Sequence, residues 1–229
     1  MTSVTFKTNN ALGDCPGIMH GDPEKSKMGL VVVQEWWGMN EQIIARGNEL
    51  AKMGNFVTMV PDLYRGKVAT DHEEAGHLMG GLDWAGAVED IRGAALFLMG
   101  KGCRKVGVTG YCMGGALSIA AAALVGELSA AAPFYGTPKA ELCDVKTINI
   151  PLQAHFGELD NIAGFSAPED ARAFEAAMAG KNNFEFFMYP TGHGFTNPNN
   201  KENYNKECAD LALSRTVDFM KKHLGSARL

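Results

Sequence analysis

Short apolar runs that end at turn residues recur along the chain, and they predict the strands of a buried sheet. The runs are Leu30–Gln34, Phe56–Val60, Lys105–Thr109, Ala130–Phe134, Pro151–Phe156 and Phe184–Tyr189. Most of them lack a clean alternation of apolar and polar residues, which is typical of strands that are covered on both faces. The pattern therefore indicates a sheet buried between two layers of other structure.

Between the runs, apolar residues spaced three and four positions apart predict helices. Four helices are expected. They are one capped by Asn40 that reaches Met53, one over Trp84–Leu98, one from Pro168 toward Gly180, and one from Glu202 to His223. Strands that alternate with helices indicate parallel strands joined by right-handed crossovers. No repeat or linker interrupts the alternation. We therefore expect one α/β domain over residues 1–229, with a mainly parallel central sheet flanked by helices.

The composition fits a globular chain and does not point to a nucleic-acid or membrane partner. About 46% of the 229 residues are hydrophobic and 21% are charged, which is enough apolar material for a core. The net charge of −5 comes without a basic cluster that would neutralise phosphates. The segment Met1–Lys7 lacks the layout of a signal peptide, and no apolar run reaches the ~18 residues of a membrane span. We expect a cytoplasmic protein.

The cysteines at positions 15, 103, 112, 143 and 208 form no pattern as a group. Their odd number in a chain of this size does not suggest a disulfide framework. No Cys-x-x-Cys pair and no His/Cys cluster has zinc-ligand spacing, so no metal site is expected. Most buried cysteines act as small apolar side chains, and only the neighbours of Cys112 set it apart.

Cys112 lies at the centre of Gly110–Gly114, with the sequence Gly-Tyr-Cys-Met-Gly, between a predicted strand and an alanine-rich helix, Ala116–Leu124. In such a turn the middle residue is strained, and its side chain protrudes at the carboxyl end of the sheet. The glycines let neighbouring backbone pass, and the helix N-terminus favours a thiolate. The segment predicts a nucleophile elbow. The alternative is a glycine-rich packing turn at a helix start.

A nucleophile elbow requires an acid and then a histidine, each in a loop after a later strand. Glu158 and Asp160 follow the fifth apolar run, and His193 follows the sixth, between two glycines. We expect His193 to accept the proton of Cys112 and the acid to orient the imidazole. Asp160 is favoured as that acid because it lies further into its loop, with Glu158 as the alternative.

The loop after the first run supplies two further candidates. Attack of Cys112 on a carbonyl produces an oxyanion that needs two backbone donors, which we expect to be the N–H groups of Met113 and Trp36. Glu35 follows directly on an apolar run and would point into the crevice at the carboxyl edge of the sheet, where a buried carboxylate is costly. We interpret Glu35 as tuning the protonation or orientation of Cys112. The alternative is a salt-bridged loop residue.

Taken together, several segments resemble the dienelactone hydrolase family, the carboxymethylenebutenolidases, over nearly the whole chain. They are Gln34–Gly38, Pro61–Tyr64, Gly110–Gly115, Gly157–Asp160 and Gly192–Phe195. The resemblance implies a monomeric, cofactor-free enzyme with the α/β-hydrolase fold and a triad of Cys112, His193 and Asp160. It also implies that Glu35 contacts the resting thiol and helps to activate it when substrate binds.

The sequence departs from this family at positions that concern the substrate. Members of the chlorocatechol pathway hold a substrate carboxylate with arginines, one of them four residues after the catalytic histidine, where this chain has Asn197. Gly194 stands where a serine commonly follows that histidine, and in segment 64–82 the only formal cations are Arg65 and Lys67. We expect an aromatic, weakly charged pocket. Its expected lining is Trp37, Tyr64, Arg65, Tyr135, Phe195 and Asn197.

The sequence as a whole predicts a cysteine-dependent hydrolase of small esters or lactones that works through a thioester intermediate. A non-hydrolytic ligand binder or a thiol-based redox sensor on the same scaffold is the alternative. The combination of nucleophile, base, acid and Glu35 favours the hydrolase, because a binding protein needs none of these groups.

Overall fold

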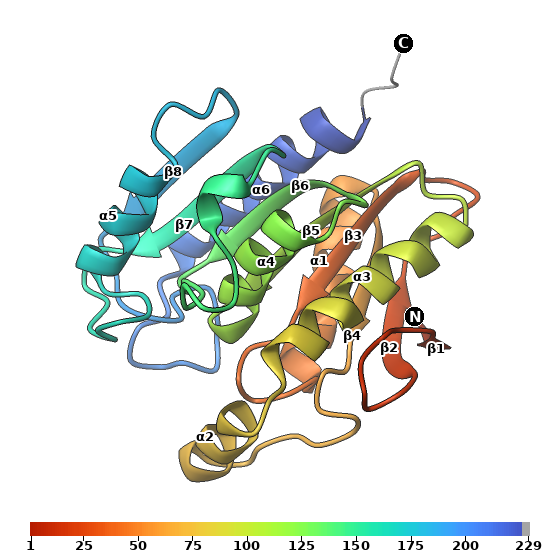
Figure 1. Cartoon of the computed structure of the whole chain (residues 1–229), viewed down its shortest axis with the longest axis horizontal. Coiled ribbons are helices and arrows are strands. Elements are labelled where there is room, and N and C mark those ends of the chain that lie inside the picture. The colour runs from red at the N-terminus through yellow and green to blue at the C-terminus, as the bar shows by residue number, and fades with distance from the viewer. Residues whose placement is uncertain (226–229) are drawn as a thin grey trace.

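An eight-stranded, mainly parallel sheet forms the centre of the computed structural model, which describes residues 1–225 (Figure 1). The strands are β1 (Thr2–Phe6), β2 (Cys15–His20), β3 (Met28–Val33), β4 (Val57–Pro61), β5 (Lys105–Tyr111), β6 (Leu128–Phe134), β7 (Leu152–Gly157) and β8 (Phe184–Tyr189). Their order is β1-β2-β4-β3-β5-β6-β7-β8. Strands β3 to β8 are parallel, whereas β2 is antiparallel to both of its neighbours. The last four residues of the predicted 1–229 domain lie outside the described residues.

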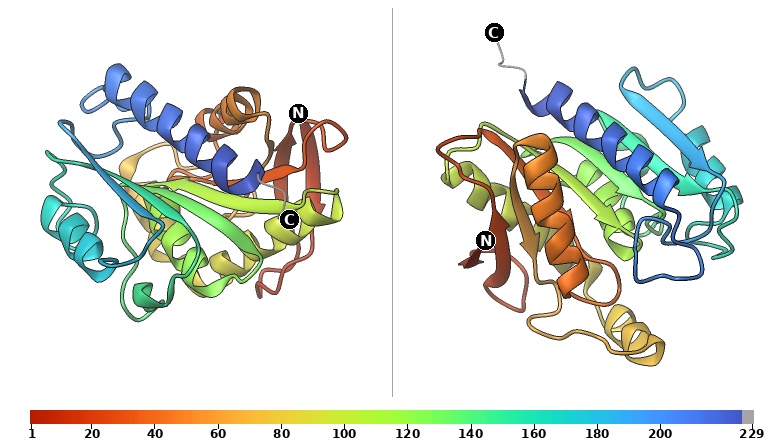
Figure 2. Two further views of the ribbon diagram at one scale, coloured as in Figure 1. Left: turned by 90° about the horizontal axis from the view of Figure 1, so that it is seen from above. Right: turned by 180° about the vertical axis from the view of Figure 1, so that it is seen from behind.

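Helices cover both faces of the sheet (Figure 2). They are α1 (Glu41–Gly54), α2 (His72–Gly80), α3 (Trp84–Gly100), α4 (Met113–Leu124), α5 (Pro168–Ala177) and α6 (Lys206–Gly225), with a short 3-10 helix at Val145–Thr147. Helices α1 and α6 pack on one face and α3, α4 and α5 on the other, so that the sheet separates two apolar clusters. In residues 1–225, no helix is both long and apolar enough to cross a membrane.

The strands and helices expected from the apolar pattern are all present, with shifted ends. Helix α6 begins at Lys206 instead of Glu202, because Asn205 caps it by accepting a hydrogen bond from the Cys208 N–H at 3.0 Å. Strands β1 and β2 and helix α2 were not predicted. Strand β2 contains Pro16 and Gly17, and both residue types are depleted in strands, which concealed it.

The carboxyl ends of the parallel strands meet at one edge of the sheet. The register pairs Val33 of β3 with Gly110 of β5, and Gly157 of β7 with Tyr189 of β8. The loops that follow β3, β5, β7 and β8 therefore start along the same edge, and these loops carry the residues singled out in the sequence. In open α/β sheets this is the edge at which ligands bind.

Candidate active site

Cys112 occupies the junction between β5 and α4, with backbone angles φ 55° and ψ −117°. A positive φ at a residue other than glycine costs about 1–3 kcal/mol. The adjoining glycines permit the turn, because a Cβ on Gly110 would overlap the carbonyl of Gly114, and a Cβ on Gly114 would overlap the carbonyls of Val33 and Gln34. The strained turn expected of a nucleophile elbow is therefore present, and Cys112 keeps 8% of its surface exposed.

His193 is paired with Asp160 through a distance of 2.7 Å between Nδ1 and Oδ2. The Asp160 side chain is completely buried, and its Oδ1 accepts a hydrogen bond from the Ile162 N–H at 3.1 Å. Glu158 is exposed to solvent, and its backbone N–H donates to the carbonyl of Tyr189, which ties its loop to the end of β8. Of the two acids that the sequence left open, the structure brings Asp160 to the imidazole.

The second ring nitrogen of His193, Nε2, is buried and has no hydrogen-bond partner among the described residues. Burial opposes a positive charge on His193, but the negative charge of Cys112 and the hydrogen bond with Asp160 outweigh burial. Together they raise the pKa of His193 from its usual 6.5 to about 10. This environment favours the charged, imidazolium form of His193.

Two side chains that hold His193 were not identified from the sequence. Ser166 is fully buried in the loop before α5, and its Oγ lies 3.1 Å from His193 Nδ1. Asn200 donates from Nδ2 to the carbonyl of His193 at 2.8 Å. No local pattern marks Ser166, because a serine shortly before a helix is ordinary. The asparagine-rich stretch 197–203 was the only available signal for Asn200.

Glu35 is buried, with 6% of its surface exposed, and both carboxylate oxygens accept hydrogen bonds. Asn197 donates from Nδ2 to Oε2 at 2.6 Å, and the Tyr135 hydroxyl donates to Oε1 at 3.4 Å. Burial raises the pKa of Glu35, although the bond from Asn197 and the charge of His193 act in the opposite direction. Among residues 1–225, Glu35 has no salt-bridge partner and no hydrogen bond with Cys112. The hydrogen bonds that the Glu35 carboxylate makes in this structure are therefore those with Asn197 and Tyr135.

Tyr135 and Phe195, which were expected in the pocket wall, are both fully buried. The Tyr135 ring lies 5.1 Å from the imidazole of His193 and 5.4 Å from the Phe195 ring, between centroids. Its hydroxyl lies 2.7 Å from Oγ1 of Thr196. A ring without exposed surface offers nothing to a substrate, so the structure places these two residues beneath the site, where they support His193.

Arg65 was also expected in the pocket, but its guanidinium is held by Asp90 of α3. Two parallel hydrogen bonds of 2.9 and 2.8 Å join the two groups, and the Asp90 side chain is completely buried. A planar guanidinium matches a carboxylate in this bidentate geometry, and a buried carboxylate requires such a partner. Arg65 is therefore committed to the fold. Lys67, the other cation of this segment, is exposed.

Aromatic side chains gather in the loop after β3 and at the start of α2. The rings of Trp36 and Trp37 lie 5.2 Å apart, and the imidazole of His72, at the start of α2, packs against them at 5.6 and 5.0 Å. The Tyr64 hydroxyl donates to Sδ of Met113, the residue after Cys112, at 3.2 Å. The contribution of His72 to this group was not predicted from the sequence.

The two backbone N–H groups expected to hold the oxyanion have no protein acceptor among residues 1–225. Met113 is the first residue of α4, and the first N–H groups of a helix have no acceptor within the helix. The N–H of Trp36 donates to no protein acceptor in the part of the chain that the structure describes. Close packing of Gly114 against the carbonyl of Gln34 brings the two segments together.

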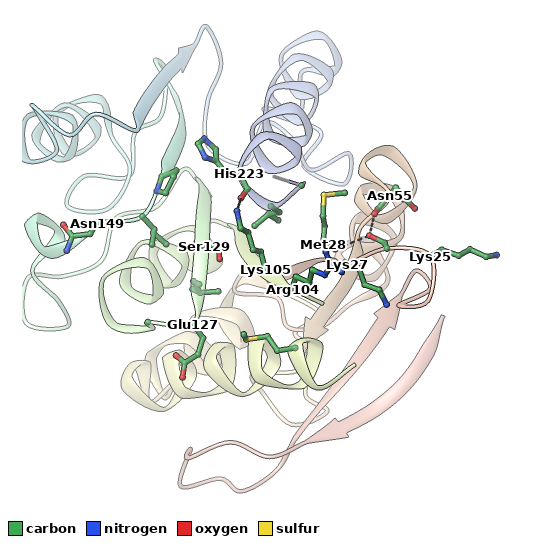
Figure 3. Close-up of a pocket in the computed structure, with 18 residues that line it drawn as sticks. Lys25, Lys27, Met28, Asn55, Arg104, Lys105, Glu127, Ser129, Asn149 and His223 are labelled. Carbon is green, nitrogen blue, oxygen red and sulfur yellow. Dashed lines mark hydrogen bonds between the residues drawn. The ribbon is translucent and has the colours of Figure 1, made fainter. Parts of the chain in front are cut away.

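A cavity of about 940 Å³ opens at the opposite, amino edge of the sheet, where β3, β5 and β6 begin (Figure 3). Lysines at this edge donate hydrogen bonds to carbonyls at the C-terminal ends of helices, which carry partial negative charge. Lys105 donates to the carbonyl of His223 in α6 at 3.0 Å, and Lys221 donates to that of Met53 in α1 at 3.1 Å. The basic character of this edge therefore has a structural cause. No group of three or more His, Cys, Asp or Glu residues within residues 1–225 is placed to hold a metal ion.

Comparison with known proteins bears on the family and the fold of this chain. A model of the dienelactone hydrolase family matches residues 17–224. Protein usf of Aquifex pyrophilus is 31% identical over 216 residues, which cover 88% of this chain and 91% of that protein. Carboxymethylenebutenolidase 1 of Cupriavidus pinatubonensis is 27% identical over 219 residues, covering 89% and 90%. The crystal structure of a dienelactone hydrolase-like promiscuous phosphotriesterase from metagenomic libraries has the same fold, with a TM-score of 0.83 at 19% identity over 98% of this chain and 99% of that one.

Proposed function

Because the chain belongs to the dienelactone hydrolase family and is thus a carboxylic ester or lactone hydrolase, we propose that it works by covalent catalysis through Cys112. The observation that carries the proposal is the hydrogen bond between His193 and the buried carboxylate of Asp160, together with the strained turn at Cys112, whose charge raises the pKa of His193. A nucleophile, a base and an orienting acid in this relation are the parts that acyl transfer requires. A ligand-binding or redox-sensing role is not favoured, because neither needs this arrangement.

In the first half of the reaction, His193 Nε2 holds the proton of Cys112. The thiolate forms a bond from Sγ to the carbonyl carbon of the ester or lactone. The resulting oxyanion is stabilised by the N–H groups of Met113 and Trp36, and loss of one such donor typically costs ~10²–10³ in kcat. When the carbonyl re-forms, the carbon–oxygen bond to the alcohol breaks. The alcohol takes the proton from His193 and leaves a thioester on Cys112.

In the second half, a water molecule gives a proton to His193 and attacks the thioester carbonyl. The carbon–sulfur bond then breaks, and the carboxylic acid leaves. Asp160 stabilises the imidazolium in both halves and keeps Nε2 directed at the reacting atoms. The balance is one ester or lactone and one water converted into an acid and an alcohol, or into a hydroxy acid when a lactone opens.

We further propose that small neutral or aromatic esters and lactones are preferred. Trp36 and Trp37 pack together in the loop after β3, and the Tyr64 hydroxyl donates to Sδ of Met113, the residue after Cys112, whereas Arg65 is engaged by Asp90. A substrate carboxylate would therefore meet aromatic surface, and Arg65 would not be free to bind it. The proposal includes the cytoplasmic location and the monomeric, cofactor-free state that the sequence suggested.

Trapping of the acyl-enzyme tests the mechanism. A slowly hydrolysed aryl ester should add one acyl group to the protein, and mass spectrometry of peptides should place that group on Cys112. Cys112→Ala should retain its fold and lose turnover, whereas Cys208→Ala should keep turnover as the matched control. A single burst without further turnover would favour the redox or binding alternative, and activity that persists in Cys112→Ala would refute the mechanism.

A further inference from the structure

Asn197 uses both ends of its side-chain amide inside the protein. Nδ2 donates to Glu35 Oε2 at 2.6 Å, and Oδ1 accepts from the backbone N–H of Asn199 at 2.9 Å. Asn197 is only 5% exposed, so little of it faces solvent or a substrate. Its amide therefore joins Glu35, after β3, to the loop that follows β8.

Of the two hydrogen bonds that the Glu35 carboxylate accepts from described residues, the one from Asn197 is the shorter. A buried carboxylate requires hydrogen bonds, and bonds to a charged acceptor are shorter and stronger than neutral ones. The second donor, the Tyr135 hydroxyl, lies at 3.4 Å and also contacts Thr196 Oγ1 at 2.7 Å. Removal of the Asn197 donor would leave the Glu35 carboxylate with one long hydrogen bond.

The loop that carries Asn197 also carries His193 and is anchored from α1. Arg46 is buried and donates from Nη2 to the carbonyl of Thr196 at 2.6 Å, which fixes the backbone directly before Asn197. Tyr135 contacts both groups: its hydroxyl donates to Glu35 at 3.4 Å, and its ring centroid lies 5.1 Å from that of the His193 imidazole. A displacement of Glu35 would therefore change the electrostatic environment of the imidazole.

We propose that Asn197 is a positioning residue, which acts on the reaction by holding Glu35 beside His193 and not by contacting the substrate. This inference rests on the proposed function. Related enzymes have a substrate-binding arginine at this position. In this chain the neutral amide of Asn197 has a different role there. Asn197 thereby affects the rate of the chemical step for every substrate alike.

The informative variant is Asn197→Asp, because it keeps the oxygen that accepts from the Asn199 N–H and replaces only the donor to Glu35. Two adjoining carboxylates bind a proton more tightly than one, so the limb of the pH–rate profile that depends on Glu35 should move upward by about one pH unit. The kcat for para-nitrophenyl acetate and for para-nitrophenyl hemisuccinate should fall by the same factor, about tenfold or more, with the ratio of the two KM values unchanged. Asn199→Ala, at an exposed neighbouring residue, is the matched control and should change neither quantity.

A double-mutant cycle separates this inference from its alternatives. In a Glu35→Gln background, Asn197→Asp should produce no further shift of the pH profile, because the group through which it acts is gone. If Asn197→Asp folds poorly, as judged by its Tm, Asn197→Ser provides the same comparison, since its side chain is too short to reach Glu35. A changed preference between the two esters with an unchanged pH profile would overturn the inference and make Asn197 a substrate contact. Turnover that survives in Cys112→Ala would instead refute the proposed function, so the two failures are distinguishable.

Discussion

The Nδ1 atom of His193 lies 2.7 Å from Oδ2 of Asp160, a carboxylate whose side chain is completely buried. The bond fixes the orientation of the imidazole, and we propose that Nε2 takes the proton of the Cys112 thiol. Ser166 shares the contact, with its Oγ 3.1 Å from the same nitrogen. The two partners of Nδ1 differ in charge, and this difference leads to the first prediction.

Asp160→Asn should reduce kcat by on the order of 10⁴, because the amide no longer stabilises the imidazolium and permits the wrong tautomer. Ser166→Ala should reduce kcat by about tenfold at most, since it removes a neutral partner and leaves the ion pair in place. The kcat values of both variants, measured on one aryl ester, check the prediction. Equal losses in the two variants would show that charge on Asp160 is not what matters.

The imidazole of His193 should stay protonated to unusually high pH, and its contribution to stability should depend on pH accordingly. Its pKa is raised from 6.5 to about 10, so the interactions of the imidazolium contribute fully to stability below about pH 6.5 and are lost as the pH rises through about 10. Cys112→Ala removes the negative charge that raises this pKa, and His193 should then titrate at lower pH. Nuclear magnetic resonance of ring-labelled histidine measures both values. An unchanged titration in Cys112→Ala would contradict an interaction between the two side chains.

Glu35→Gln should change the resting enzyme as well as turnover. A carboxylate in the site disfavours a free thiolate before substrate arrives, so removal of its charge should make Cys112 more sensitive to peroxide. If Glu35 also accepts a proton during the reaction, kcat should fall by about 10². Rates of peroxide inactivation and of ester hydrolysis, compared with the wild type, measure the two effects. Equal values for both enzymes would reduce Glu35 to a structural residue.

Substrate preference provides the fourth prediction. A lost charge-assisted hydrogen bond is worth about 1.5–3 kcal/mol, which corresponds to ~10 to ~100-fold in kcat/KM. A neutral methyl ester of a lactone should therefore be hydrolysed better than the corresponding carboxylate. Arg65→Ala should lower the Tm, because it leaves Asp90 buried without its partner, and should leave the substrate ratio unchanged. A preference for the carboxylate that disappears in Arg65→Ala would reverse this conclusion.

Much of the site could be predicted from short stretches of sequence. The turn at Cys112 is encoded by Gly110 and Gly114, since any Cβ there would overlap backbone, and the strand and helix on either side follow from apolar spacing. The order of nucleophile, acid and histidine along the chain, each after a strand, places them at one edge of a parallel sheet. These features are local, or follow from topology, and need no knowledge of which side chains touch.

Contacts between distant side chains were decided only by the tertiary structure. Asn197 and Glu35 are 162 positions apart, and nothing in either segment shows that an amide of one binds a carboxylate of the other. The choice of Asp160 over Glu158, and the pairing of Arg65 with Asp90, depend likewise on which group the packed loops bury. Burial makes an unpaired polar group costly, so a side chain finds its partner among whatever the fold brings within reach, and that neighbourhood exists only after the chain has folded.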